Sequence, residues 1–389
     1  MRCSKPQGMM IRGNLLLLLG FAEDDPKMAS VRWRRFKRQL GKDGFSVDWL
    51  AVKLPYCDDS SSASAKAFCE FRVLRHARRL AGQLAEGRNA TAKTIVLASI
   101  PTLDPLYVGA MLKRLCGSSI QLILEVRDVY ARPELFEYNG LRRRLEVFKE
   151  TMLIRPVDKV IYLTDEIRRR YCTYYPHLAA VCNGVVITNG YDPEEYGPCP
   201  SAESNGTLLE IGYFGSFYAS RNPELLFQTL SRLRSNSPRQ AAGTRIHIWG
   251  EARHYPLEEK IRVYNLRDIV VYHGLCPHES LMKQYTGTAV NLIITHTAGS
   301  SYALPGKLFE YVGAQRPVWA ITDDRILRDF ITRHRLGYLS SHDPGSIEET
   351  LRAILRDHAS AGRLPNITAP PDYEIGSLTR ELETFLFDG

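Results

Sequence analysis

The sequence lacks the cysteine patterns that mark a metal site or a disulfide framework. Its eight cysteines are scattered along 389 residues, with no Cys-x-x-Cys pair and no metal-ligand spacing to histidine. The carboxylate pairs Asp58-Asp59 and Asp323-Asp324 have no third candidate ligand in view. We therefore expect no bound metal or other cofactor, and scattered thiols of a reducing compartment, which indicates a cytoplasmic protein.

Long hydrophobic runs are also missing. No segment approaches the about 18 consecutive apolar residues of a membrane-spanning helix. Arg2, Lys5 and Arg12 precede the apolar run 15–19, as in a signal peptide, but the run is short and acidic residues follow at once. Because no small-residue cleavage site is present either, we expect residues 15–19 to form a first buried strand.

Two kinds of binding motif are absent. No Gly-x-Gly-x-x-Gly turn follows a predicted strand, which disfavours a dehydrogenase built on a dinucleotide-binding domain. No helix-turn-helix, zinc-finger or RNP-type pattern is present, so we expect no nucleic-acid partner.

Positive charge, in contrast, is abundant and clustered. The formal net charge is +8, and the stretch from Arg32 to Lys42 contains six basic residues and no acid. Trp33, Phe36 and Leu40 lie at helical spacing within it, which predicts an amphipathic helix. Two interpretations are open: a solvated face above a core stripe, or a surface that contacts anionic lipid at the inner face of a membrane or attracts an anionic acceptor. A second basic group comprises Arg72, Arg75, Arg78 and Arg79.

Apolar runs alternate with helical patterns along the chain, which predicts parallel sheets covered on both faces. In the first half we expect strands at 14–20, 47–53, 94–99, 121–125, 159–164 and 180–188, with helices at 29–42, 64–86, 105–116 and 139–155. In the second half we expect strands at 207–213, 245–250, 269–273, 289–294, 318–322 and 336–340, with helices between them.

The predicted fold class is therefore α/β, with two Rossmann-like, doubly wound domains that face a cleft. Residues 1–190 form the N-terminal domain, and 191–206, rich in Pro, Gly and Ser, form a linker. Residues 207–368 form the C-terminal domain. Residues 369–389 form a helix that returns toward the first domain. Ligands of such sheets bind outside the carboxyl ends of the strands.

The most informative block is 302–322. A Leu-Pro-Gly turn leads into a short helix that carries Lys307 in its first turn and Glu310 one turn later. The helix start offers backbone N–H groups, a positive dipole end and a lysine, which together suit a phosphate. Lys307 and Glu310 share a face, so one can hold a phosphate while the other accepts hydrogen bonds from a ribose.

A second loop carries another cation. The strand 207–213 runs into Gly215 and Ser216, and Arg221 follows at the junction with the next helix. If both loops lie at the carboxyl end of one sheet, Arg221 and Lys307 converge on a pyrophosphate. The other interpretation is that Arg221 is an ordinary surface arginine near a helix cap.

Four segments, in order, resemble retaining glycosyltransferases of family 4, which have the GT-B fold. They are Asn-Gly-Tyr-Asp at 189–192, the glycine loop from Phe214 to Arg221, the Trp-Gly-Glu and His-Gly pairs at 249–251 and 273–274, and the Pro-x-Lys-x-x-Glu-Tyr block with its Arg-Pro ending. The resemblance covers most of the chain and is strongest over 186–330. In the first half, Glu125-Val-Arg-Asp128 resembles a strand end on the acceptor side. The resemblance implies that residues 1–190 form an acceptor-binding domain and residues 207–368 a nucleotide-sugar-binding domain.

The resemblance implies a metal-independent sugar transfer from a nucleotide-diphosphate sugar to a saccharide, a lipid-linked saccharide or a small molecule. It gives Arg221 and Lys307 the task of stabilising the departing diphosphate, and Glu310 the ribose. Asp104 and Asp128, at strand ends of the first half, could contact the acceptor, although such carboxylates are often helix caps. The implied donor-binding residues are Gly215, Ser216, Gly250, Glu251, Gly274, Leu275, Tyr302, Leu304, Gly306 and Glu310.

The sequence departs from the family pattern at two positions that bear on the sugar. Tyr302 stands where the family commonly has the first acid of a Glu-x7-Glu pair, and Ser216 stands where an arginine often follows the loop glycine. The alternative hypothesis is therefore a non-catalytic protein that binds a nucleotide sugar or another partner on the same fold.

Overall fold

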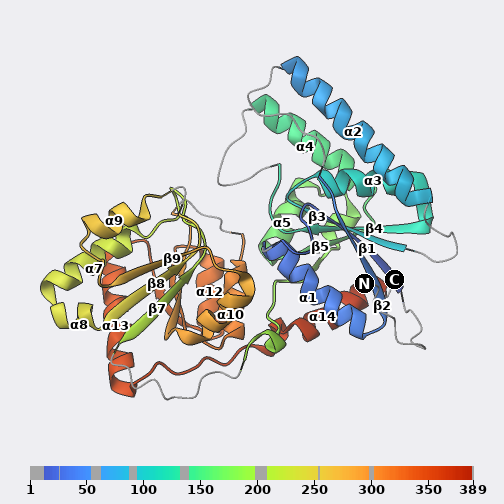
Figure 1. Ribbon diagram of the computed structural model, residues 1–389. Helices are drawn as coiled ribbons and strands as arrows, with labels where there is room; N and C mark the ends of the chain where they lie inside the picture. The colour runs from blue at the N-terminus through green and yellow to red at the C-terminus, as the bar shows by residue number, and fades with distance from the viewer. Residues whose placement is uncertain are drawn as a thin grey trace. The chain divides into compact units, whose positions relative to one another are not determined.

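The computed structural model divides the chain into two compact units (Figure 1). The N-terminal unit comprises Met1–Thr188 and Ile375–Gly389, and the C-terminal unit comprises Asn189–Glu374. The residues that the structure describes are 13–25, 27–53, 63–86, 94–131, 140–197, 208–252, 255–297 and 302–387. The predicted linker 191–206 lies partly outside these ranges, and its residues 191–197 belong to the C-terminal unit.

The N-terminal unit contains a parallel sheet in the order β2-β1-β3-β4-β5-β6. Strands β3 and β4 are buried along their whole length, as expected for a parallel sheet covered on both faces. The strands are β1 (Gly13–Leu19), β2 (Phe45–Ala51), β3 (Thr94–Ile100), β4 (Ile120–Val126), β5 (Lys159–Tyr162) and β6 (Val185–Val186).

Seven α-helices accompany this sheet in the described ranges: α1 (Met28–Lys42), α2 (Ala63–Glu86), α3 (Asp104–Cys116), α4 (Gly140–Ile154), α5 (Asp165–Tyr174), α6 (Ala179–Cys182) and α14 (Ile375–Phe387). Helix α14 comes from the end of the chain and packs beside α1 (Figure 1). Its Leu378, Leu382 and Leu386 join Trp33 and Phe36 of α1 in one apolar cluster. The predicted return of the C-terminal helix to the first domain is confirmed.

The C-terminal unit contains a second parallel sheet, in the order β12-β11-β10-β7-β8-β9. Its strands are β7 (Leu209–Phe214), β8 (Thr244–Trp249), β9 (Val270–Gly274), β10 (Val290–Ile294), β11 (Val318–Ile321) and β12 (Gly337–Ser340). The chain moves outward from β7 through β8 to β9, and outward the other way from β10 through β11 to β12. The topological switch point is therefore between β7 and β10, where open α/β sheets bind ligands beyond the strand ends.

Helices cover both faces of this second sheet. One apolar cluster gathers side chains of α7 (Glu224–Asn236), α9 (Leu257–Val263) and α13 (Pro344–Ala361). The other cluster gathers those of α10 (His278–Gly287), α11 (Gly306–Gly313) and α12 (Arg325–Arg333). The short helix α8 (Pro238–Ala242) follows α7, and 3₁₀ turns occur at Gly117–Ser119, Pro193–Glu195 and Pro371–Tyr373.

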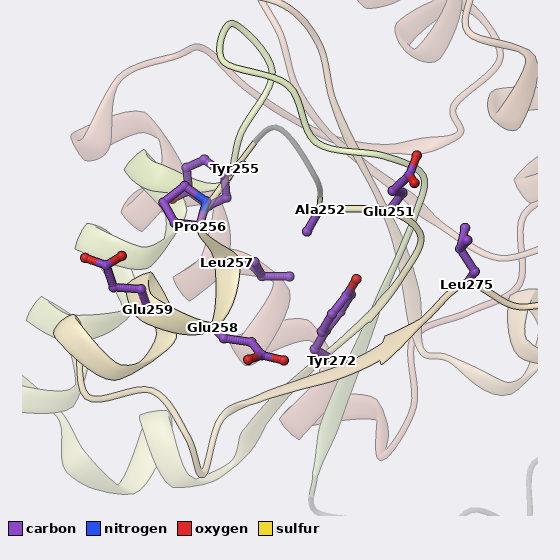
Figure 2. A pocket seen from close by; sticks show the side chains of 9 residues that line it. All are labelled: Glu251, Ala252, Tyr255, Pro256, Leu257, Glu258, Glu259, Tyr272 and Leu275. Atoms are coloured by element: carbon purple, nitrogen blue, oxygen red, sulfur yellow. The ribbon is translucent and has the colours of Figure 1, made fainter.

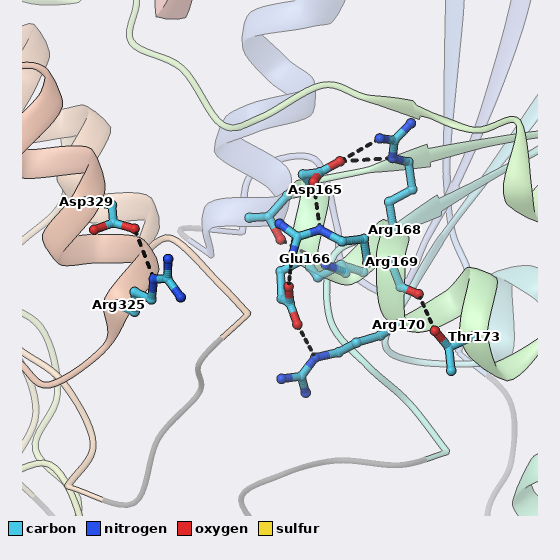
Figure 3. Close-up of polar contacts among 10 residues, drawn as sticks. Asp165, Glu166, Arg168, Arg169, Arg170, Thr173, Arg325 and Asp329 are labelled. Atoms are coloured by element: carbon cyan, nitrogen blue, oxygen red, sulfur yellow. Dashed lines mark hydrogen bonds and ion pairs between the residues drawn. The ribbon is translucent and has the colours of Figure 1, made fainter.

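The expected doubly wound architecture is confirmed, with local differences. The predicted strand 180–188 is wrong in its first part, where the chain forms α6 before the two-residue strand β6. Helix α5 is absent from the prediction because it buries few apolar side chains, Ile167 and Tyr171 among them. Ion pairs within the helix support it instead: Asp165 pairs with Arg168 and Arg169, and Glu166 with Arg170 (Figure 3).

The basic helix α1 also differs from its predicted form. Arg32 and Arg35 are buried rather than solvated, and Lys37 forms an ion pair with Glu23 at 2.8 Å. The Arg32 guanidinium reaches the core of the unit and donates from Nε to Glu125 at 2.9 Å. Of the six basic residues between Arg32 and Lys42, Arg32 and Arg35 are therefore buried in the N-terminal unit and Lys37 is paired with an acid.

Candidate functional site

Two glycines lie at the carboxyl ends of neighbouring strands in the C-terminal unit, beside the switch point. Gly215 follows β7 with φ +147°, and Gly250 follows β8 with φ +143°, conformations that side chains rarely adopt. The Gly215 N–H donates to the Trp249 carbonyl at 2.8 Å. A Cβ at Gly250 would overlap the Gly215 backbone, and a Cβ at Gly215 would lie 3.1 Å from Lys307 Nζ. The two loops therefore touch through backbone alone.

Lys307 extends from the first turn of α11 toward Gly215. Its Nζ lies 4.3 Å from the centroid of the Tyr213 ring. The Nζ atom is buried and has no hydrogen-bond partner among the described residues. Burial, and then the positive charge of Arg221, hold the pKa of Lys307 well below its usual value. A protonated amine here lacks the acceptors that a buried charge needs.

Arg221 lies beside Lys307 and brings a second cation. Its Nη2 donates to the Ser216 carbonyl at 3.1 Å, and its guanidinium stacks over the Tyr218 ring at 4.8 Å. Its Nε is buried without a hydrogen-bond partner in the described part of the chain. The structure thus brings together Arg221, Lys307, Gly215 and Ser216, four of the predicted site residues.

His296, at the carboxyl end of β10, was not predicted from the sequence. Its Nδ1 lies 2.7 Å from Ser220 Oγ, and burial, Arg221 and Lys307 all lower its pKa. A lowered pKa keeps the imidazole neutral beside two cations. The only signal in the sequence that places His296 near this site is its position after the predicted strand 289–294.

Glu310, Tyr302, Leu304 and Gly306 complete the block around α11. Glu310 is 1% exposed, and its Oε2 accepts a hydrogen bond from the Tyr196 hydroxyl at 2.9 Å. Tyr302 is buried, Leu304 packs at the edge of an apolar cluster, and Gly306 begins the helix after Pro305. The ribose role of Glu310 and the donor role of Tyr302 stay predictions.

A cavity of about 510 Å³ adjoins the loops after β8 and β9 (Figure 2). Tyr272 lines it and donates from its hydroxyl to the Gly250 carbonyl at 3.1 Å. Two predicted donor-binding residues, Glu251 and Leu275, also line it, and Gly274 precedes Leu275 with φ +71°. Arg221 and Lys307 are not among its lining residues. The cavity is therefore next to the cationic group along the sheet edge and separate from it.

Asp104 and Asp128 belong to the N-terminal unit and not to this group. Asp104 is nearly buried in the first turn of α3. Asp128 follows β4, and its Oδ1 accepts a hydrogen bond from the Val129 N–H at 2.8 Å. Their proposed contact with an acceptor stays a prediction.

A buried polar network at the end of β4 was missed from the sequence. Glu125 accepts hydrogen bonds from Arg32 Nε at 2.9 Å, Trp33 Nε1 at 2.8 Å and Ser99 Oγ at 2.6 Å. Burial by itself would raise the pKa of Glu125, but Arg32, Arg127 and these hydrogen bonds outweigh it and lower the pKa. Arg32 also donates to the carbonyls of Ile187 and Thr188. Glu125 therefore ties α1 to the carboxyl ends of β3 and β4.

No protein-family model and no curated protein matches the chain. Solved structures do match over nearly its whole length. It is similar to sucrose-phosphate synthase from Thermosynechococcus elongatus, with 16% identity, a TM-score of 0.63, and coverage of 97% of this chain and 95% of that one. It is also similar to a UDP-forming α,α-trehalose-phosphate synthase from Burkholderia xenovorans in complex with glucose-6-phosphate. The identity is 13% and the TM-score 0.65, with coverage of 97% of this chain and 100% of that one. Anabaena HepE in complex with UDP has 15% identity to this chain and a TM-score of 0.58, with coverage of 96% of this chain and 95% of that one.

These likenesses concern the fold, because each identity is well below a quarter. The two parallel six-stranded sheets with flanking helices match glycosyltransferase structures across both units. The predicted GT-B fold is confirmed.

Proposed function

We propose that the protein is a retaining glycosyltransferase that moves a sugar, of the hexose type, from a nucleotide-diphosphate sugar to a hydroxyl group. The observation that carries this proposal is the buried Lys307 Nζ, which has no acceptor among the described residues and lies beside Arg221. Two adjacent cations with buried, unused donors are matched by a ligand that carries several anionic oxygens.

A diphosphate fits this demand better than a single carboxylate. It supplies two anionic groups in a row, one for each cation, and restores the acceptors that Lys307 Nζ and Arg221 Nε lack. Each charge-assisted hydrogen bond would contribute about 1.5–3 kcal/mol. The start of α11 adds backbone N–H groups and a positive dipole end.

The nucleoside half would extend from the diphosphate along the sheet edge. We assign the ribose to Glu310, which is one helical turn from Lys307, and the base to the loops around Gly250, Glu251, Gly274 and Leu275. The cavity beside these loops offers the Tyr272 ring as a flat apolar wall. The UDP in the HepE structure supports a uridine nucleotide as a first candidate.

The chemistry asks the protein to stabilise charge on a leaving group. As the glycosidic bond to the diphosphate breaks, negative charge grows on the diphosphate oxygens. Lys307 and Arg221 would offset that charge from fixed positions, which is why we infer catalysis without a metal ion. We infer retention through attack by the acceptor hydroxyl on the face that the diphosphate leaves. The acceptor oxygen forms the new glycosidic bond as the bond to the diphosphate breaks, and its proton passes to the departing phosphate oxygen, with no enzyme nucleophile.

The acceptor is a saccharide, a lipid-linked saccharide or a small molecule with a reactive hydroxyl. The glucose-6-phosphate in the trehalose-phosphate synthase structure supports a saccharide. Asp104 and Asp128 are the carboxylates that we assign to acceptor contact in the N-terminal unit.

The test is release of nucleoside diphosphate from a panel of UDP-, GDP- and dTDP-sugars, with acceptor extracts and with EDTA present. We expect turnover with at least one donor, and a fall of at least about tenfold in Lys307→Met and in Arg221→Met. The anomeric configuration of the product is read by NMR. An inverted product contradicts retention. Turnover that both variants retain contradicts the site.

A second candidate is a non-catalytic protein that binds a nucleotide sugar. Tyr302 favours it, because a buried tyrosine stands where a sugar-contacting acid is common in the resembled family. This candidate predicts that nucleotide binds through Lys307 but that no donor is consumed.

A further inference from the structure

The N-terminal unit exposes an apolar stripe along α4. Leu141, Leu145 and Phe148 are 72%, 52% and 65% exposed. They are spaced four and three residues apart, so they lie on one face of the helix. Single exposed leucines need no explanation, but three large apolar side chains in a row indicate a surface that is covered in use.

The opposite face of α4 is fixed in the unit. Glu150, Leu153 and Ile154 are buried. Glu150 accepts hydrogen bonds from the hydroxyls of Tyr171 at 2.6 Å and Tyr175 at 2.5 Å. Turning the stripe inward would break these buried bonds. The helix is therefore held with Leu141, Leu145 and Phe148 outward.

Positive charge flanks the stripe on both sides. At about 100° per residue, Arg144 lies about 60° to one side of Leu141, and Arg142 lies about 100° to the other. Arg142, Arg143 and Arg144 are all exposed. Long cationic side chains beside an apolar stripe can extend their charged ends to phosphates while their stems cover apolar surface.

Further cations lie on the same side of the sheet. Helices α2, α3 and α4 follow successive strand connections that run in one direction, which places them on one face. Helix α3 contacts both α2 and α4 (Figure 1). Arg72, Arg75, Arg78 and Arg79 of α2 are exposed.

We propose that α4 docks on an anionic lipid surface, with Leu141, Leu145 and Phe148 inserted at the boundary of headgroups and acyl chains. The charge complementarity decides the occupant: an apolar stripe between cations suits anionic headgroups above an apolar layer. The docking is interfacial, since no helix in the described ranges is long and apolar enough to span a bilayer.

This surface differs from the one that the sequence suggested. In the stretch from Arg32 to Lys42, the two arginines Arg32 and Arg35 are buried. The apolar residues Trp33, Phe36 and Leu40 are buried as well. Helix α4 instead keeps both its cations and its apolar stripe outside. The inference is independent of the donor site.

The test is flotation of the full chain with phosphatidylcholine vesicles, with and without phosphatidylglycerol. We expect at least about tenfold more protein on the anionic vesicles at low salt, and less at high salt. The variant Leu141→Ser/Leu145→Ser/Phe148→Ser should lose at least about tenfold of this binding. The variant Arg142→Gln/Arg143→Gln/Arg144→Gln should weaken the preference for anionic lipid, which the arginines of α2 still support, and an unchanged preference would overturn the role of the α4 cations.

A matched control replaces exposed apolar residues elsewhere. Leu115→Ser/Val263→Ser, at positions that are 51% and 65% exposed, should float like the unsubstituted chain. Circular dichroism and the melting temperature show that each variant is folded. Equal binding to neutral vesicles, no binding, or unchanged binding of the triple serine variant would overturn the proposal. A dimer that forms without lipid and disappears in that variant would also overturn it, because a second copy would then be the occupant.

Discussion

Gly215 and Gly250 are the residues on which the geometry of the candidate site depends most directly. Both have backbone conformations that favour glycine, and the Gly250 position has no room for a Cβ against the Gly215 backbone. Gly274, in the neighbouring loop, also has a positive φ but has open space around it. A side chain at Gly274 therefore meets backbone strain without steric overlap, whereas one at Gly250 meets both.

We predict that Gly250→Ala lowers the free energy of unfolding more than Gly274→Ala does. The backbone strain at Gly274, whose φ of +71° is close to the αL region, should amount to about 1–2 kcal/mol. The overlap with Gly215 adds to backbone strain only in Gly250→Ala and moves the loop away from Lys307. Urea denaturation and nucleotide titration of both variants provide the measurements. Equal stability and equal nucleotide affinity in the two variants would contradict the close approach.

The identity of Lys307, Arg221 and Gly215 as candidate site residues could be predicted from the sequence, because helix starts and glycine turns after strands have local signals. Their convergence is a property of strand order: Arg221 follows β7 and Lys307 follows the loop after β10, the two neighbours at the switch point. His296 could not be singled out, because one histidine after a strand has no distinguishing pattern.

At the scale of elements, α1 and the end of β4 are joined by a buried ion pair. Arg32 and Glu125 are 3% and 0% exposed, and Trp33 and Ser99 hydrogen-bond to the same carboxylate. Removing one partner leaves an uncompensated charge in the interior, which usually destabilises a protein by about 3–5 kcal/mol.

We predict that Arg32→Met lowers the unfolding free energy by about 3–5 kcal/mol, since Glu125 then lacks its main partner. Arg38→Met, on the same helix but exposed, is the matched control and should change stability by less than about 0.5 kcal/mol. Chemical denaturation near neutral pH measures both. Similar losses in the two variants would show that Arg32 contributes no more than a surface arginine.

The pH dependence of this contribution has a definite sign. The folded pKa of Glu125 is below its ordinary value of 4.5, so the unfolded chain binds more protons in that range. The stabilisation by Glu125 is complete above the ordinary pKa and is lost as the pH falls through the folded pKa. Arg32→Met should therefore flatten the acid limb of the stability profile.

The sequence could not reveal this pair. Arg32 belongs to a run of basic residues that predicts a solvated face, and only the position of Glu125 at the end of a neighbouring strand turns that arginine inward. The same limit applies to α5, which ion pairs support more than apolar periodicity does. In α4, by contrast, the exposed stripe is visible only once Glu150 and its tyrosines fix the buried face.

At the scale of the whole molecule, strand–helix alternation predicted two doubly wound units, and the resemblance of four segments to glycosyltransferases of family 4 implied the GT-B fold. Each unit has its own apolar clusters. The chain passes through the C-terminal unit before α14 joins the apolar cluster of the N-terminal unit. The alternation does not indicate which ligand is bound, because ligand specificity depends on a few side chains and not on the order of the elements.

We propose that the C-terminal unit binds the diphosphate of a nucleotide sugar through Lys307 and Arg221. Isothermal titration of the full chain with UDP, GDP, ADP and dTDP tests it most directly, with Lys307→Met and the exposed-lysine control Lys42→Met alongside. We predict saturable binding of at least one nucleoside diphosphate, weakened at least about tenfold in Lys307→Met and unchanged in Lys42→Met. No binding of any of the four, or equal affinity in all three proteins, would contradict the account.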